Sequence, residues 1–263
     1  MLVDVNAYIG HWPFLQLQYN NCRGILDRMN RFGVDLSVVS NLNGIFYKNT
    51  QSANRELSDA LKSSRQFGNR FIPFAVINPV YGGWRDDLET SLDKLGMKGI
   101  RLYPQYHDYT PDDPSCIELV KRVRDRGLPV ALSLRMVDNR QRSWMDIEKE
   151  WSLKDIMPLV REVPDAKFLI LNVANGAHLS DEESALLKRA GVLMDTSGRA
   201  LTNLGDLLGK YGKDKFAFGT HAPILDYLTG LLRIESMREN EADAETKELL
   251  KAGNAKRFFA LSQ

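Results

Sequence analysis

The sequence returns eight times to a short apolar run, and each run is followed by a segment with helical spacing. Runs such as FIPFAVI and KFLILNV are apolar throughout and rich in branched aliphatic residues. A strand covered on both faces has this composition, whereas a half-exposed antiparallel strand alternates apolar and polar residues. The pattern predicts parallel strands joined by helices. The predicted strands are Leu2–Asn6, Asp35–Asn41, Arg70–Asn78, Lys98–Tyr103, Pro129–Arg135, Lys167–Val173, Gly191–Asp195 and Lys215–Thr220.

The segments between these runs place apolar residues at steps of three and four. That spacing gives a helix one apolar stripe, which can cover one face of a sheet. Three predicted stripes are Ile25, Met29 and Phe32; Leu57, Ala60 and Leu61; and Ile117, Val120 and Val123.

Chain length decides between the two folds that such alternation permits. The chain has 263 residues, so eight units average about 33 residues each, and a (β/α)8 barrel typically has about 250 residues. A doubly wound open sheet is the competitor, but VNAYIGHWPF follows the first strand in place of a glycine fingerprint. We predict an α/β fold, a (β/α)8 TIM barrel forming a single domain over residues 1–263.

Composition excludes several classes of function. Hydrophobic residues make up 43% of the chain, and 35 Lys and Arg nearly balance 34 Asp and Glu, so neither disorder nor nucleic-acid binding is favoured. No run approaches the length of a membrane span, and MLVDVNAYIG does not resemble a signal peptide. Cys22 and Cys116 lie far apart without a CxxC pair. We expect a cytoplasmic protein with reduced thiols and no membrane partner.

In such a barrel the reactive groups gather where the strands end, because eight loops converge there on one mouth. An Asn or Ser at these positions is also an ordinary turn former or helix cap, so each has a structural as well as a functional interpretation. The candidates at the strand ends are Asn6, Tyr8, Asn41, Asn78, Arg101, Tyr103, Ser133, Arg135, Asn172, Asn175, Asp195, Thr196 and His221.

Two arginines among these candidates are the strongest indication of a binding site. Arg101 lies within GIRLYP, and Arg135 ends the apolar run VALSLR. A guanidinium stays charged and is costly to remove from water, so each needs a protein carboxylate or a bound anion. Asp138 is a nearby protein partner for Arg135. If both arginines point into the mouth, they indicate a small substrate that carries a carboxylate or phosphate.

Eight segments, in order along the chain, resemble the amidohydrolase superfamily, specifically the amidohydrolase-related branch of decarboxylases and lactonases that act on small carboxylic acids. The resemblance spans most of the chain and implies the same barrel. The segments are Val3-Asp4 leading to Gly10, GVDLSVVS, RFIPFAVINP, GMKGIRLYP, KFLILNVANG, VLMDTSG, FAFGTHAPILD and GNAKRFFAL.

The metal site of that family does not carry over. The family pattern implies a His-x-His pair after the first strand, histidines at the fifth and sixth strands and an aspartate after the eighth. The corresponding residues here are Asn6 with Tyr8, Ser133, Asn172 and His221. Neutral amides and hydroxyls are weak ligands, so we expect no tight zinc site. Weak divalent metal binding at His221, with Asp195 or His178, is the alternative.

We therefore predict a metal-independent hydrolase or lyase of a small carboxylate-bearing compound, such as a lactone or a related acid. The predicted catalytic residues are His221 as acid or base and Tyr8 and Asn172 as hydrogen-bond donors to a developing oxyanion. A catalytically inactive barrel that binds a small anion or serves as a partner subunit, and a metal-dependent hydrolase with atypical ligands, are the alternatives. The predicted substrate-binding residues are Asn6, His11, Arg101, Tyr103, Ser133 and Arg135.

Two further expectations concern loops. The segment Met136–Lys154 exceeds the usual loop length and contains Trp144, which suggests a lid or a contact in a homodimer. His107, in YPQYHDY, lies after the fourth predicted strand, where we expect it at the surface.

Overall fold

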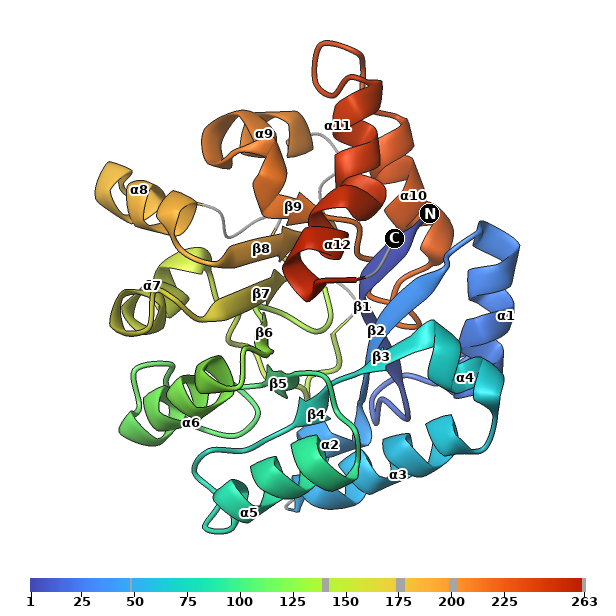
Figure 1. Ribbon diagram of the computed structural model, residues 1–263, viewed down its shortest axis with the longest axis vertical. Helices are drawn as coiled ribbons and strands as arrows, with labels where there is room; N and C mark the ends of the chain where they lie inside the picture. The colour runs from blue at the N-terminus through green and yellow to red at the C-terminus, as the bar shows by residue number, and fades with distance from the viewer. Residues whose placement is uncertain (48, 139–141, 174–177, 199–202, 262–263) are drawn as a thin grey trace.

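The computed structural model describes residues 1–47, 49–138, 142–173, 178–198 and 203–261. Within them, nine short parallel strands form a ring surrounded by helices, so the predicted TIM barrel is confirmed (Figure 1). The strands are β1 (Val3–Ile9), β2 (Leu36–Asn41), β3 (Phe71–Pro73), β4 (Ala75–Val76), β5 (Ile100–Leu102), β6 (Pro129–Ser133), β7 (Lys167–Leu171), β8 (Val192–Asp195) and β9 (Phe216–Ala217).

Backbone hydrogen bonds connect the two ends of the ring. The strands pair in the order β1-β2-β3 and β4 to β9. Val5 N–H donates to the Phe218 carbonyl at 2.9 Å, and His221 N–H donates to the Asn6 carbonyl at 2.7 Å. These bonds join the first strand to the segment after β9, so residues at opposite ends of the chain become neighbours at the mouth.

The predicted strand Arg70–Asn78 is divided into β3 and β4 on either side of Phe74. Phe74 N–H donates to the Val39 carbonyl of β2, and Ala75 N–H donates to the Gly99 carbonyl beside β5. The chain therefore changes its hydrogen-bonding partner at this point, which ends one sheet and starts the next. A single predicted strand becomes two short ones because its neighbours lie on different sides.

Helices surround the ring and bury the predicted apolar stripes. Ile25, Met29, Leu57 and Val120 are fully buried in the layer between helices and strands. The α-helices are α1 (Cys22–Phe32), α2 (Asn43–Phe46), α3 (Thr50–Lys62), α4 (Arg65–Arg70), α5 (Trp84–Glu89), α6 (Pro114–Asp125), α7 (Leu153–Glu162), α8 (Asp181–Arg189), α9 (Leu204–Tyr211), α10 (Tyr227–Glu235), α11 (Ala244–Glu248) and α12 (Asn254–Phe259). Short π-helical segments lie at Thr90–Lys94 and Leu249–Gly253, and a 3₁₀ helix lies at Lys213–Lys215.

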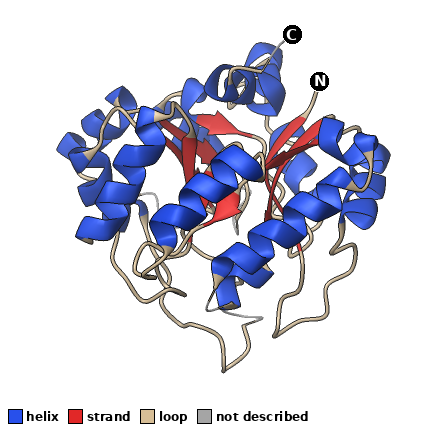
Figure 2. Ribbon diagram, turned by 60° about the horizontal axis from the view of Figure 1, so that its bottom comes forward, coloured by secondary structure: helices blue, strands red, loops and turns tan. Residues whose placement is uncertain are grey.

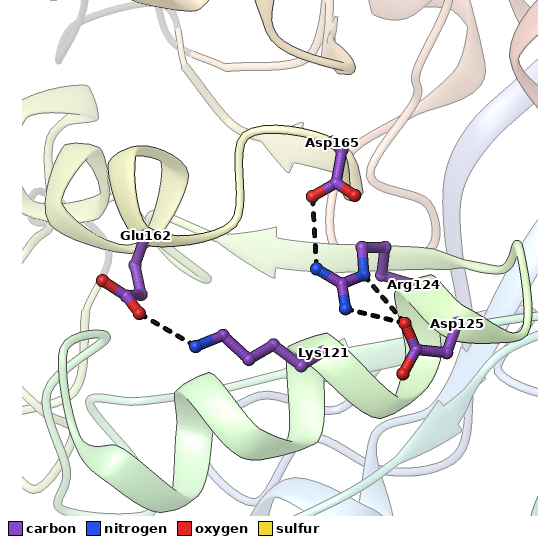
Figure 3. A network of polar contacts seen from close by, with 5 residues as sticks. All are labelled: Lys121, Arg124, Asp125, Glu162 and Asp165. Carbon is purple, nitrogen blue, oxygen red and sulfur yellow. Dashed lines mark hydrogen bonds and ion pairs between the residues drawn. The ribbon is translucent and has the colours of Figure 1, made fainter.

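Neighbouring helices are also linked by ion pairs on the outer surface. Lys121 of α6 contacts Glu162 at the end of α7 at 2.9 Å, and Arg124 contacts both Asp125 and Asp165 (Figure 3). Exposed pairs of this kind contribute little to stability, so the apolar stripes account for most of the packing between helix and barrel.

The two ends of the barrel differ in their contents. Toward the start of the strands, the interior is filled by Val3, Val5, Phe74 and Leu169, and α12 packs against this layer. Both termini lie at this end, while long loops extend from the opposite end (Figure 2). The polar residues that follow the strands therefore lie at the end with the long loops.

Two features concern the chain as a whole, namely its helices as membrane spans and its cysteines. Among the described residues, no helix has both the length and the apolar character that crossing a bilayer requires. Cys22 and Cys116 are free and buried, and burial raises the pKa of the Cys22 thiol to about 11.

Candidate functional site

The predicted catalytic residues meet at the imidazole of His221. The side-chain amide of Asn172 lies 2.8 Å from His221 Nδ1, and the Tyr8 hydroxyl lies 3.3 Å from the same nitrogen. His221 Nε2 lies 2.7 Å from the Met136 carbonyl oxygen. Because a carbonyl can only accept, Nε2 carries the proton and Nδ1 is the acceptor.

Asp195 at the end of β8 organises the amides around this histidine. Its carboxylate accepts from Asn6 Nδ2 at 2.7 Å, from the Asn172 backbone N–H at 2.7 Å and from the Ser197 hydroxyl. Ser197 Oγ also lies 3.0 Å from Asn172 Oδ1. The acceptor capacity of Asp195 is thus largely used to orient Asn6 and Asn172 toward His221.

Two residues of this network have a left-handed backbone. Asn172 and His221 both have φ of 61°, a conformation that asparagine tolerates and histidine adopts less readily. The Asn172 N–H bond to Asp195 and the His221 N–H bond to Asn6 hold these conformations in place. Backbone strain of about 1–3 kcal/mol per residue persists only where the surroundings enforce it, and it is often found at functional sites.

Arg101 is the most unusual side chain of the mouth. It has no exposed surface, and none of its three guanidinium nitrogens has a hydrogen-bond partner among the described residues. Its guanidinium carbon lies 4.4 Å from the centre of the Tyr8 ring, a cation–π contact. The Tyr103 hydroxyl, also buried, makes no contact of hydrogen-bond geometry within the described chain, although it lies close enough to interact with the Arg101 guanidinium. Donors without acceptors therefore accumulate beside Tyr8.

His221 is buried, and three arginines act on its imidazole. Burial, together with the nearby charges of Arg101, Arg135 and Arg233, lowers the pKa of His221 to about 3. The imidazole is therefore neutral at physiological pH. Arg135 pairs with Glu150 at 3.7 Å.

Asp4 and Arg233 were not predicted as part of the site. Asp4 is fully buried below Asn6 and accepts from the Thr220 hydroxyl at 2.7 Å, and burial raises its pKa to about 7. Arg233 of α10 donates to the Gly198 carbonyl, and its charge acts on Asp195. A carboxylate inside an otherwise apolar strand was a usable signal for Asp4, whereas Arg233 lies on a helix that only the fold brings to β8.

The loop after β6 covers the mouth. The Met136 carbonyl contacts His221, and Met136 Sδ lies 3.7 Å from the Tyr8 hydroxyl. Tyr106 donates to Asp146 at 3.1 Å, which ties the loop to the segment after β5. Asn6, Tyr8, Arg101 and His221 are all buried next to these contacts. The predicted segment Met136–Lys154 includes residues 139–141, and these and the candidate Asn175 lie outside the described chain.

The other predicted substrate-binding residues are placed as follows. Ser133 is buried, with its hydroxyl 3.5 Å from that of Tyr8. His11 lies apart from this cluster: it is exposed, and its Nδ1 lies 3.1 Å from Asn20 Nδ2. The expectation that His107 lies at the surface is wrong. Its ring is buried, and Nε2 lies 3.3 Å from the Gly44 carbonyl, because the segment after β5 folds inward over α2.

The donor set at the mouth fits a divalent metal poorly. The positions next to His221 hold amides and hydroxyls, and Asp195 is engaged by three donors. The described residues contain no group of three or more His, Cys, Asp or Glu that could bind an ion together. The predicted alternative partner His178 is exposed and shares no contact with His221 in the described chain. Three arginines also disfavour a cation at this position.

Comparison with known proteins gives one match to a family model and many to solved structures. The amidohydrolase family model matches residues 26–261. A search of curated proteins found no match.

Three solved structures illustrate the structural similarity. A 2,6-dihydroxybenzoate decarboxylase complexed with 2,6-dihydroxybenzoate has a TM-score of 0.76 and 16% identity, with 99% of each chain covered. The 2,6-dihydroxybenzoate decarboxylase from Rhizobium has a TM-score of 0.72 and 15% identity, with 98% of each chain covered. A dihydroxybenzoic acid decarboxylase from a Polaromonas species, with bound manganese and the inhibitor 2-nitroresorcinol, has a TM-score of 0.71 and 14% identity, covering 100% of this chain and 97% of that one. At these identities the similarity shows the shared fold.

Proposed function

We propose a function from the premise that this chain belongs to the amidohydrolase family, whose model matches residues 26–261. The proposed function is that of a lyase that removes the carboxyl group of a small carboxylic acid bound at the mouth of the barrel. One observation carries the proposal: Arg101 is a fully buried cation without a hydrogen-bond partner in the described chain.

An anion would satisfy this cation. A buried unpaired charge costs several kcal/mol, about the amount that a bidentate carboxylate could offset. The Tyr103 hydroxyl also makes no contact of hydrogen-bond geometry within the described chain and could donate to the same anion. The decarboxylases of similar fold act on dihydroxybenzoates according to their descriptions, which supports a carboxylate rather than a phosphate.

Tyr8 is the proposed proton donor. Decarboxylation breaks the bond between carbon and the carboxyl group, releases CO₂ and leaves an electron pair on carbon that must take up a proton. Burial raises the pKa of Tyr8, so its hydroxyl is protonated at physiological pH. Once CO₂ leaves, Arg101 loses its anion and can stabilise the Tyr8 phenolate that forms when the proton is transferred, since the guanidinium lies over the ring.

The other predicted roles are assigned on the same geometry. Asn172 and Asn6 would hold a developing negative charge through their amide N–H groups, and Asp195 positions both. Hydrolysis is the less favoured reaction, because His221 with a pKa of about 3 is a weak base for activating water. The acid–base role of His221 stays a prediction.

We also propose that these residues work without a resident divalent metal. The amides, hydroxyls and arginines around His221 support this part of the proposal. The manganese in the Polaromonas structure is the finding against it, so the experiment below measures metal directly.

A barrel that binds the same acids without converting them is the second candidate. The complete burial of Arg101 and the low pKa of His221 favour this candidate. Turnover distinguishes the two candidates, since both require carboxylate binding.

The experiment measures binding, turnover and metal content on one protein preparation. Thermal shift and calorimetry with benzoate, salicylate and 2,6-dihydroxybenzoate should show binding that is absent for benzamide and lost in Arg101→Met. The exposed Arg189 provides a matched control, Arg189→Met, which should bind like the parent. Tyr8→Phe should retain binding while CO₂ release falls about 10²- to 10⁴-fold.

Each outcome has a defined meaning. If none of the acids binds, the anchor and the function are both wrong. Binding without CO₂ release supports the second candidate. Stoichiometric manganese, or turnover that appears only when manganese is added, contradicts the metal-independent part.

A further inference from the structure

A second cavity lies at the opposite end of the barrel from the mouth. It has a volume of about 740 Å³ and is lined where strands begin, by residues such as Leu36, Phe71, Pro129 and Lys167. Phe258 and Phe259 of α12 form another wall. Catalytic groups of TIM barrels gather at the ends of the strands, so this cavity is separate from the proposed active site.

The cavity is formed by apolar surface. Its lining includes Ile72, Leu95 and Leu128, and Phe259 packs edge-on against Phe74 of the barrel interior with ring centres 6.2 Å apart. Pockets that hold small organic ligands have volumes of about 300–1,000 Å³ and mostly apolar walls. The volume and the lining therefore match those of a ligand site.

The charged side chains of the described lining are all positive. Lys62, Arg65, Lys98 and Lys167 contribute to the lining, and no Asp or Glu does among the described residues. None of the four cations forms an ion pair within the described chain. Four unpaired positive charges around an apolar hollow complement a ligand with an apolar body and a negative head group.

We propose that this cavity binds a small amphipathic anion, a molecule with a hydrocarbon or aryl body and one carboxylate or sulfonate group. The apolar body lies against Phe258, Phe259 and Ile72, and the anionic group lies toward Lys98 and Lys167. This site does not depend on the chemistry proposed at the mouth.

The test uses two fluorescent probes that differ in charge. Anilinonaphthalene sulfonate is the anionic probe, N-phenylnaphthylamine is the neutral analogue, and dodecanoate is the competitor. The anionic probe should bind saturably, be displaced by dodecanoate and bind more weakly at high salt, because exposed cations are screened. The neutral analogue should bind more weakly.

Variants locate the binding. Lys98→Gln with Lys167→Gln should weaken binding of the anionic probe about fivefold or more. Lys154→Gln with Lys188→Gln changes the net charge equally at exposed positions away from the lining and should have no effect. Gly68 lines the cavity, and a Cβ added there would meet open space, so Gly68→Phe should fill the hollow and abolish binding without loss of folding.

Three results would overturn the proposal. They are the absence of saturable binding, equal affinity for the neutral probe, and affinity for the anionic probe that is unchanged in both Gly68→Phe and the Lys98/Lys167 double variant. Circular dichroism checks that each variant is folded. Because the mouth is unaltered in these variants, carboxylate binding at Arg101 is measured separately and can fail or succeed independently.

Discussion

The two ends of this barrel differ in the side chains that fill them, although the same strands form both ends. Near the start of the strands, Val5, Phe74 and Leu169 fill the interior with apolar side chains, and charge is confined to the exposed rim. Near the end of the strands, Arg101 and Asp195 lie fully buried among amides and hydroxyls. A buried charge costs stability, whereas a packed apolar layer supplies it. The apolar end therefore stabilises the folded barrel. The polar end holds reactive groups at a cost in folding free energy.

The largest effect is expected at the apolar end. Phe74→Ala removes a ring without exposed surface that packs against Phe259. The free energy of unfolding should fall by about 3–5 kcal/mol, because neighbouring side chains can fill only part of the space that the deleted ring leaves. Urea denaturation measures this change. The exposed Phe46 is the control, and Phe46→Ala should cost much less. Equal losses for the two variants would contradict the importance of the apolar layer.

The second prediction concerns pH at the polar end. The pKa of His221 is about 3 in the folded protein, below its ordinary value of 6.5. The unfolded chain therefore binds more protons, and the contribution of this group to stability is lost as pH falls from about 6.5 toward 3. The loss should approach about 5 kcal/mol at the acid limit. In His221→Gln this contribution is absent.

The measurement is the difference in unfolding free energy between parent and His221→Gln at several pH values. A difference is needed because Asp4 has the opposite pH dependence. Burial raises the pKa of Asp4 to about 7, so its effect is to lower the stability of the folded protein as pH rises from about 4 to 7. His107→Gln is a control for a second buried histidine, whose pKa is about 4. Parallel curves for parent and His221→Gln would show that His221 does not titrate as described.

A third variant separates stability from function at the mouth. Arg101→Met replaces an unpartnered buried charge by an apolar side chain of similar length. Without ligand, the variant should be more stable than the parent by about 1–3 kcal/mol, since the cost of burying the charge is removed. Denaturation with and without benzoate tests this. Destabilisation of the ligand-free variant would mean that the contact with Tyr8 outweighs the cost of burial.

The smallest effect is expected on the outer surface. Lys121→Gln removes the pair with Glu162 that links α6 to α7 (Figure 3). Both side chains are exposed and screened by solvent, so the midpoint of urea denaturation should not change measurably. A clear shift would show that this exposed ion pair contributes more to stability than its exposure implies. The expected difference in energetic effect between exposed charges and the buried Arg101 would then be contradicted.

The sequence by itself determined the barrel and most of the central cluster. Apolar runs at regular spacing specify strands covered on both faces, and the end of each strand must lie at the mouth, so Asn6, Tyr8, Asn172 and His221 could be placed together before any contact was known. Local periodicity carries this information because it reflects which face of each element is buried.

Only the tertiary structure decided the burial, protonation and pairing of those residues. It made His221 neutral by burying it close to three arginines, left Arg101 without a hydrogen-bond partner in the described chain, buried His107 and placed His11 outside the cluster. It also divided the third predicted strand at Phe74. Burial, protonation and pairing depend on neighbours that are far apart in the chain, such as Asn6 and His221, and no local pattern records which of them meet.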